Sequence, residues 1–177
     1  MKVVVALDDS DFSRHALAWV LDHLFPAADA GQPAAAEPRP ELVLVHALEP
    51  LRHIMYPVGP GSAVYGAPSM MESVRAAQAE NARGLLDRAK RTCHQRGVSA
   101  EAVVVEGEPR EALCRAAADM GAGLLVVGSR GLGAIKRAFL GSVSDYCAHR
   151  ASCPIMVVKP PRDDGDDDGH ACQTASS

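Results

Sequence analysis

The chain has 177 residues, which is enough for one domain with a sizeable core, and its formal net charge is −4. Residues 161–177 contain one arginine and five aspartates, which account for the whole net charge and leave residues 1–160 neutral overall. A neutral body with an acidic tail excludes the clustered basic surface on which nucleic-acid-binding proteins depend.

The five cysteines favour an intracellular protein with free thiols. Their number is odd, and no pair has the spacing of a metal site or of a CxxC redox motif. The apolar run at the N-terminus is too short for a signal peptide or a membrane span. We therefore expect a cytoplasmic protein, with the nucleus as the alternative, and no membrane partner.

Apolar runs predict five strands, and their alternation with amphipathic segments predicts an α/β fold. The expected strands are Lys2–Leu7, Leu42–Ala47, Ala100–Val105, Leu124–Val127 and Ile155–Lys159. The expected helices span about residues 11–24, 69–96, 109–120 and 142–150. Because the strands are apolar throughout and not only at alternate positions, we expect a parallel sheet with helices on both faces.

Polar residues predict how three of the helices begin. A side-chain oxygen of Asp9-Ser10 can cap the first helix by accepting from an unpaired backbone N–H group. Ser69 and Glu72 have the spacing of a capping box for the second helix. Ser142 or Ser144 can cap the last helix in the same way.

Three segments are expected to lie outside these elements. Phe25–Pro40, rich in alanine and proline, is predicted to be a surface insertion. Glu49–Pro68 holds four prolines and several glycines, and it is predicted to be a long loop. The acidic segment 161–177 has too little apolar content to fold, so we expect a disordered tail after one domain at residues 1–160.

The order of the strands decides where a ligand would bind, and the residues leave two orders open. Ligands of parallel sheets bind beyond the carboxyl ends of the strands, where the strand order reverses. The order 3-2-1-4-5 would place the first and fourth strands side by side and bring Asp8 next to Gly128. The order 2-1-3-4-5 would place the third strand at the reversal.

The stretch Leu124–Ser144 carries the strongest functional signal. A strand is followed by the glycine-rich turn Gly128–Gly133 and later by a second turn, Gly141–Ser144, at the start of a helix. Glycines let a backbone approach an anion, and free N–H groups at a helix N-terminus point toward its charge. Arg130 and Lys136 add positive charge, so the stretch predicts phosphate binding. Composition by itself favours an ordinary strand-to-helix connection.

The spacing of this stretch is more specific than its composition. Gly128, Gly131 and Gly141-Ser142 follow the pattern G-x2-G-x9-G-[ST], by which the chain resembles the ATP-binding universal stress proteins over nearly all of residues 1–160. No Gly-Lys-Ser/Thr sequence follows, so the stretch is not a Walker A loop. The resemblance is to single-domain, plant-like members. It implies a Rossmann-like, five-stranded parallel sheet in the order 3-2-1-4-5, of the adenine nucleotide alpha hydrolase-like type.

The resemblance also implies a nucleotide site. The residues that it places near the adenine and the ribose are Leu7, Asp8, Ala47, Val127 and Gly128. The residues that it places at the phosphates are Arg130, Gly131, Gly141, Ser142, Val143 and Ser144. The extra glycine at Gly133 and the arginine at Arg130 depart from the usual family pattern and bear on how many phosphates are held. No residue is assigned a catalytic role.

The implied function is that of a stress-response regulatory protein that binds ATP or AMP, with Mg²⁺ as a companion ion. Its conformation or partner affinity would change with the nucleotide bound. One alternative is a slow ATPase, because no general base beside the loop supports fast hydrolysis. The other alternative is a dimeric adaptor that acts only through protein contacts.

The last strand lies at an edge of the sheet in the implied order, and an apolar edge strand favours pairing with another chain. We therefore expect an antiparallel homodimer through Pro154, Ile155, Met156, Val157 and Val158.

Overall fold

The computed structural model describes residues 1–26, 40–51, 55–59, 62–65, 68–131 and 140–160. In this part of the chain one sheet contains β1 (Lys2–Ala6), β2 (Glu41–Leu48), β5 (Ala100–Glu106), β6 (Leu124–Gly128) and β7 (Ile155–Val158). The helices are α1 (Asp11–His23), α2 (Pro68–Gln95), α3 (Pro109–Asp119) and α4 (Ser142–Arg150). A separate hairpin contains β3 (Met55–Gly59) and β4 (Ser62–Tyr65). The strands of the sheet and the helices confirm the elements predicted from the sequence.

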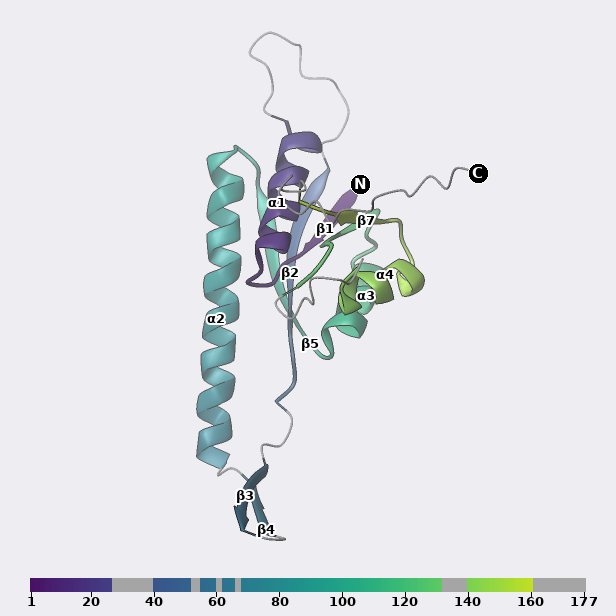
Figure 1. Cartoon of the computed structure of the whole chain (residues 1–177). Coiled ribbons are helices and arrows are strands. Elements are labelled where there is room, and N and C mark those ends of the chain that lie inside the picture. The colour runs from purple at the N-terminus through teal and green to yellow at the C-terminus, as the bar shows by residue number, and fades with distance from the viewer. Residues whose placement is uncertain (27–39, 52–54, 60–61, 66–67, 132–139, 161–177) are drawn as a thin grey trace, which may run out of the picture.

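The five strands of the sheet run parallel in the order β5-β2-β1-β6-β7 (Figure 1). Counted along this sheet, the order is 3-2-1-4-5, which confirms the fold that the resemblance implies and excludes the alternative order. In the register, Val4 of β1 lies between Val43 of β2 and Leu125 of β6. The strand order therefore reverses between β1 and β6.

Helices cover both faces of the sheet, which explains why its strands are apolar throughout. α1 and α2 cover one face of the sheet (Figure 1). Val3 and Val5 of β1 are fully buried on this face. α3 and α4 pack on the other face, where Val4 is fully buried. Because successive residues of a strand point to opposite faces, one short strand contributes to two cores.

The structure contains the cap predicted for α1 but not the one predicted for α2. Ser10 Oγ accepts from the backbone N–H of Ser13 at 3.2 Å, which confirms the cap of α1. α2 begins at Pro68, so Ser69 lies inside the first turn, where its carbonyl accepts from Ser73 Oγ at 2.9 Å. The capping box predicted at Ser69 is therefore wrong, because a proline suited to the first helical position starts the helix earlier.

The segment predicted to be a long loop contains a β-hairpin, so that prediction is wrong for β3 and β4. The two strands pair antiparallel, with Tyr56 opposite Val64 and a register shift between Pro57 and Gly59. Both strands of a two-stranded ribbon are edge strands, in which a proline does not have to break a ladder hydrogen bond. The hairpin lies beyond the sheet, near the start of α2 (Figure 1).

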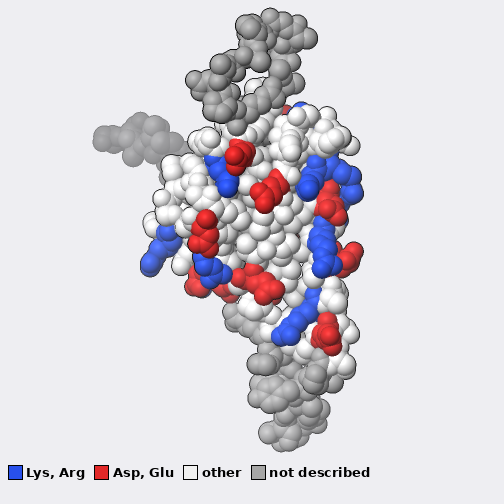
Figure 2. Space-filling view, turned by 180° about the vertical axis from the view of Figure 1, so that it is seen from behind, with Lys and Arg blue, Asp and Glu red and all other residues white. Residues whose placement is uncertain are grey.

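Charges of both signs are mixed on the surface. Figure 2 shows α2 along the right-hand edge, where basic and acidic side chains alternate. Arg83 and Glu80 of this helix form an ion pair of 3.5 Å. None of the described helices is both long and apolar enough to cross a membrane. Most of the predicted insertion, residues 27–39, and the predicted tail, residues 161–177, lie outside the described residues.

Candidate functional site

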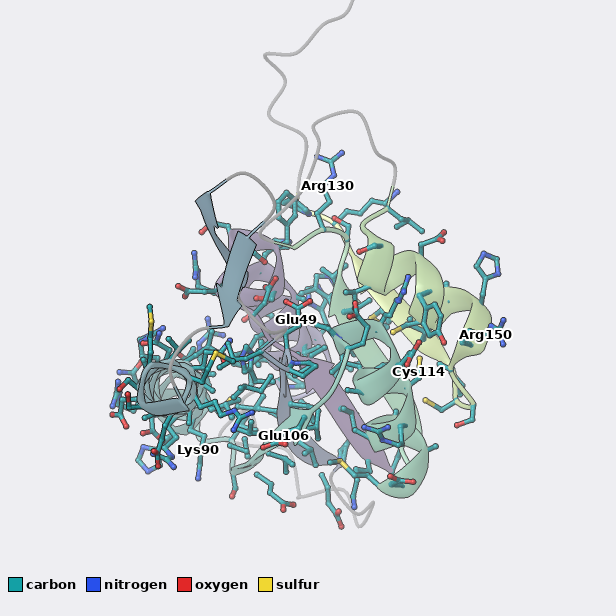
Figure 3. All side chains as sticks on the ribbon, turned by 90° about the horizontal axis from the view of Figure 1, so that it is seen from below. Glu49, Lys90, Glu106, Cys114, Arg130 and Arg150 are labelled. Atoms are coloured by element: carbon teal, nitrogen blue, oxygen red, sulfur yellow. The ribbon has the colours of Figure 1, made fainter. Side chains whose placement is uncertain are left out.

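A cleft of about 1290 Å³ opens at the carboxyl ends of β1 and β6, where the strand order reverses. Figure 3 looks onto these strand ends and shows Glu49 near the centre, with α2 on one side and α3 and α4 on the other. The structure brings every residue of the implied nucleotide site to this one cleft, which is lined by Leu7, Asp8, Ala47, Val127, Gly128, Arg130, Gly131, Gly141, Ser142, Val143 and Ser144. Their part in binding a nucleotide stays a prediction.

Asp8 follows β1 and contacts both the start of α1 and the first glycine turn. Its Oδ1 accepts from the backbone N–H of Ser10 at 3.1 Å and also from Ser10 Oγ. Its Oδ2 lies beside the glycine turn, because a Cβ atom added at Gly131 would be 2.8 Å from it. One carboxylate oxygen therefore supports the cap of α1, while the other lies at the cleft.

Hydrogen bonds to main-chain carbonyls and close backbone packing hold the two glycine turns against each other. The Gly141 N–H donates to the Ser129 carbonyl at 2.8 Å, and Ser144 Oγ donates to the carbonyls of Ser129 and Gly141 at 3.2 and 2.9 Å. A Cβ atom at Gly141 would lie 3.2 Å from Arg130 Cα. The φ angle of Gly141 is an ordinary −76°, so this glycine serves close approach and not an unusual backbone conformation.

The N-terminus of α4 faces the cleft without a capping side chain. Its N-cap residue is Gly141, so the prediction that Ser142 or Ser144 caps the helix is wrong. The physical reason is that Ser142 is already the first helical residue, whereas the Ser144 hydroxyl is bound to main-chain carbonyls. The first N–H groups of a helix have no partner inside it. Those of Ser142, Val143 and Ser144 are therefore suited to an anion.

Arg130 brings positive charge to the rim of the cleft. Its guanidinium carbon lies 5.8 Å from the centre of the Phe12 ring at the start of α1, which is a cation–π distance. Figure 3 shows Arg130 at the edge of the strand ends, on the side of the glycine turns. Lys136, the other cation predicted at the phosphates, lies outside the described residues.

Sequence reasoning missed the helical walls of the cleft. One wall is α2, which contributes Gln78, Asn81 and Arg88, and the other is the start of α3, which contributes Pro109 and Arg110. The spacing of Gln78, Asn81 and Arg88 places them on one face of a helix, and this spacing is the signal that could have identified the first wall. The second wall becomes evident only from the strand order, because α3 follows the carboxyl end of β5.

Three polar side chains in the cleft differ in how they are bound. His46 Nδ1 donates to the Leu7 carbonyl at 2.8 Å, since a carbonyl can only accept. Arg88 forms an ion pair of 3.4 Å with Asp9 near the rim. Gln78 Oε1, in contrast, is buried without a hydrogen-bond partner among the described residues. A buried amide oxygen without a partner is costly, so it marks a place where a ligand donor fits.

A parallel sheet in this order, with glycine turns and an open helix N-terminus at the point of reversal, defines a Rossmann-like α/β protein with its cleft at the switch point. The chain belongs to the universal stress protein family, because the family model described as "Universal stress protein family" matches residues 1–159. The match confirms the resemblance seen in the glycine spacing.

One relative and two solved structures illustrate the similarity. A universal stress protein A-like protein of Arabidopsis thaliana is 36% identical over 112 residues, which cover 59% of this chain and 63% of that protein, less than two thirds of its length. A universal stress protein solved in complex with cAMP has a TM-score of 0.59 and 27% identity, with 89% of this chain and 96% of that one covered. An Arabidopsis thaliana family protein solved with AMP bound has a TM-score of 0.63 and 24% identity, with 95% and 97% covered, and shows the fold alone.

Proposed function

We propose that the chain is a stress-response regulatory protein and that an adenine nucleotide, ATP or AMP, binds in the cleft. The observation that carries this proposal is the open N-terminus of α4, which faces the same cleft as Asp8 and Ala47. Phosphates, a ribose and a flat base need an anion site, a polar acceptor and an apolar surface, in that order. The cleft offers all three along one path.

The phosphates would bind at the start of α4. The N–H groups of Ser142 and Val143 have no intrahelical partner, and Arg130 supplies charge from the rim. Ser142 is exposed, so its hydroxyl can also donate to a phosphate oxygen. Ser144 is 2% exposed and its hydroxyl is bound to main-chain carbonyls, so it would contribute its backbone N–H alone.

The ribose and the base would bind between the ends of β1 and β2 and the α2 wall. Asp8 Oδ2 can accept from a ribose hydroxyl while Oδ1 keeps its bond to Ser10. Leu7 and Ala47 line the same region of the cleft with apolar atoms. Gln78 Oε1 can accept from the exocyclic amine of adenine, which would give the buried oxygen its missing donor. The relative that was solved with cAMP supports an adenine nucleotide as the ligand.

A bound Mg²⁺ would depend on the phosphates. The described residues contain no group of three His, Cys, Asp or Glu side chains placed to hold a metal ion. Mg²⁺ is commonly held by nucleotide phosphates, waters and one or two carboxylates, so the ion would arrive with the nucleotide. We assign the chain no metal site of its own.

Regulation would follow from the position of the cleft between helices. A nucleotide that contacts α4, the glycine turns and the α2 wall favours whichever arrangement of these elements it binds more tightly. We propose that this shift changes the affinity for protein partners in the cytoplasm. The edge strand β7 would join two copies of the chain into a homodimer.

The decisive experiment begins with the full-length protein as purified, without added nucleotide. The protein is denatured, and released nucleotides are identified by anion-exchange chromatography. Nucleotide-free protein is then titrated with ATP and with AMP by calorimetry. We expect near-stoichiometric adenine nucleotide in the first measurement or saturable binding in the second. An empty protein that binds neither nucleotide would overturn the proposal and favour the adaptor.

A variant of Asp8 gives this experiment its control. Asp8→Asn keeps an oxygen for the Ser10 cap but removes the charge, and a lost charged hydrogen bond of about 1.5 kcal/mol weakens binding about tenfold. The matched variant Asp119→Asn changes an exposed residue at the end of α3, outside the cleft, and should leave the affinity unchanged. A time course with ATP and Mg²⁺ separates slow hydrolysis from stable binding.

A further inference from the structure

We propose that Cys114 and Cys147 form a peroxide-responsive thiol pair that closes to a disulfide between α3 and α4. The two Sγ atoms lie 3.5 Å apart, within hydrogen-bond distance. Cys114 is half-buried on α3, and Cys147 is fully buried on α4. Figure 3 shows Cys114 on the side of α3 that faces α4. The proposal is independent of the nucleotide site.

The positions of the cysteines favour this pair over the others. A disulfide brings two sulfurs to about 2 Å, so the pair must close by roughly 1.5 Å, which side-chain rotation on two packed helices can supply. Cys93 lies in the core on the opposite face of the sheet and cannot reach either thiol. Cys153 packs on the same core as Cys114, which makes it the competing partner for Cys147.

The surroundings of the two thiols give them different roles. Burial raises the pKa of Cys147 to about 12, and the hydrogen bond with Cys114 adds to the rise. Cys147 therefore keeps its proton at neutral pH. Its S–H donates to the Arg110 carbonyl at 3.9 Å, and the Cys114 S–H donates to Cys147 Sγ. Cys114 is half-buried, so hydrogen peroxide reaches its sulfur first.

The chemistry proceeds in two balanced steps. The Cys114 thiolate attacks hydrogen peroxide, an S–O bond forms as the O–O bond breaks, and the leaving hydroxide takes a proton to become water. Cys147 Sγ then attacks the sulfenic sulfur of Cys114, the S–S bond forms as the S–O bond breaks, and the leaving hydroxide takes the Cys147 proton. The two sulfurs lose two electrons, and the peroxide is reduced to two molecules of water.

Trypsin separates the three cysteines of this region, which allows a direct test. Cleavage after arginine and lysine leaves Cys114 in EALCR, Cys147 in AFLGSVSDYCAHR and Cys153 in ASCPIMVVKPPR. The full chain, with Cys172→Ser to remove the thiol outside the described residues, is treated with hydrogen peroxide and then alkylated. Mass spectrometry without reduction should find EALCR joined to AFLGSVSDYCAHR, at the sum of their masses less two hydrogens. Reduction should abolish this species.

Three variants decide the assignment. Cys114→Ser, at the half-buried position, should abolish the joined peptide, whereas Cys93→Ser and Cys153→Ser should leave its yield unchanged. Circular dichroism establishes that each variant is folded. A bridge between the Cys147 and Cys153 peptides would overturn the assignment, as would a bridge between two copies seen as a doubled mass on a non-reducing gel. Oxidation of Cys114 with no joined peptide would also overturn it.

Discussion

Asp8 Oδ2 lies so close to Gly131 that a Cβ atom at this glycine would be 2.8 Å away. Gly131→Ala must therefore displace the carboxylate or the turn. Because Ser10 holds the other oxygen of Asp8, we expect α1 to keep its cap while AMP affinity in calorimetry falls about tenfold or more. The control is Gly84→Ala on the α2 wall, where the added methyl would lie at an ordinary 3.6 Å from Arg88 Nη1. Equal AMP affinities of wild type and Gly131→Ala would show that Asp8 does not contact the ligand.

Loss of the hydroxyl group should lower the stability of the fold at Ser144 and the affinity for nucleotide at Ser142. Ser144→Ala removes a buried donor to the Ser129 and Gly141 carbonyls, so we expect a loss of about 1–2 kcal/mol in urea unfolding. Ser142→Ala changes an exposed group, so stability should change by less than about 0.5 kcal/mol while nucleotide affinity falls. A large stability loss in Ser142→Ala would contradict the division of roles between the two serines.

Gln78 should determine which base the cleft prefers. Its buried Oε1 can accept from the amine of adenine, whereas inosine monophosphate carries a carbonyl at that position. We expect the wild type to bind AMP about tenfold more tightly than inosine monophosphate. Gln78→Met, of similar size, should lose this preference in parallel titrations. The same loss of affinity for both nucleotides would show that Gln78 packs against the ligand without distinguishing its base.

The edge strand β7 gives a test of the predicted homodimer. The carbonyls of Pro154 and Val158 accept from the N–H groups of Leu125 in β6 and of Ser129 directly after it. Because groups alternate in direction along a strand, the N–H of Val157 points away from the sheet. Val157→Pro removes this outward donor without breaking a bond to β6, which an edge strand tolerates. We expect a dimer in the wild type and a monomer in the variant by analytical ultracentrifugation. A variant that is folded and still dimeric would place the interface elsewhere.

Cys93 should make the fold sensitive to alkaline pH. It is fully buried, and burial raises its pKa from an ordinary 9.0 to about 11. As the pH rises, the thiol ionises in the unfolded chain before it ionises in the fold. The stabilising effect of the buried neutral thiol is therefore complete below pH 9 and is lost as the pH rises toward 11. At about pH 10.5 the loss is about 2 kcal/mol. Urea unfolding of wild type and Cys93→Ala at about pH 8 and about pH 10.5 measures this loss. The difference between the two proteins in free energy of unfolding should be smaller at the higher pH by that amount.

The strands of the sheet could be predicted because burial on both faces leaves continuous apolar runs, such as Val3–Val5 and Leu42–Val45. The strand order could not be predicted from such runs, because both topologies need the same alternation of strands and helices. The spacing from Gly128 to Gly141 carried that information through the family resemblance. The hairpin was missed because its prolines and glycines are typical of loops.

The candidate site was predictable where it follows a strand and was missed where it depends on packing. Asp8 and Gly128 come directly after apolar runs, so parallel strands bring them to one edge. Gln78 looks like any polar residue on the solvent face of a helix until α2 is placed beside the cleft. α4 lacks a side-chain cap because the Ser144 hydroxyl donates to the Ser129 and Gly141 carbonyls, and no local sequence pattern distinguishes such a hydroxyl from a capping one.

The cleft is lined both by Leu7, which lies near the beginning of the chain, and by Ser144, which lies in α4. No contiguous fragment that lacks either region contains the whole site. A chain that has only begun to fold therefore cannot bind the proposed nucleotide, because the site needs contacts between segments far apart in the sequence, and such contacts are slow to form. We expect added nucleotide to slow the unfolding of the folded protein without accelerating the earliest steps of refolding. Occupancy of the cleft would then report that α4 has packed against the rest of the structure.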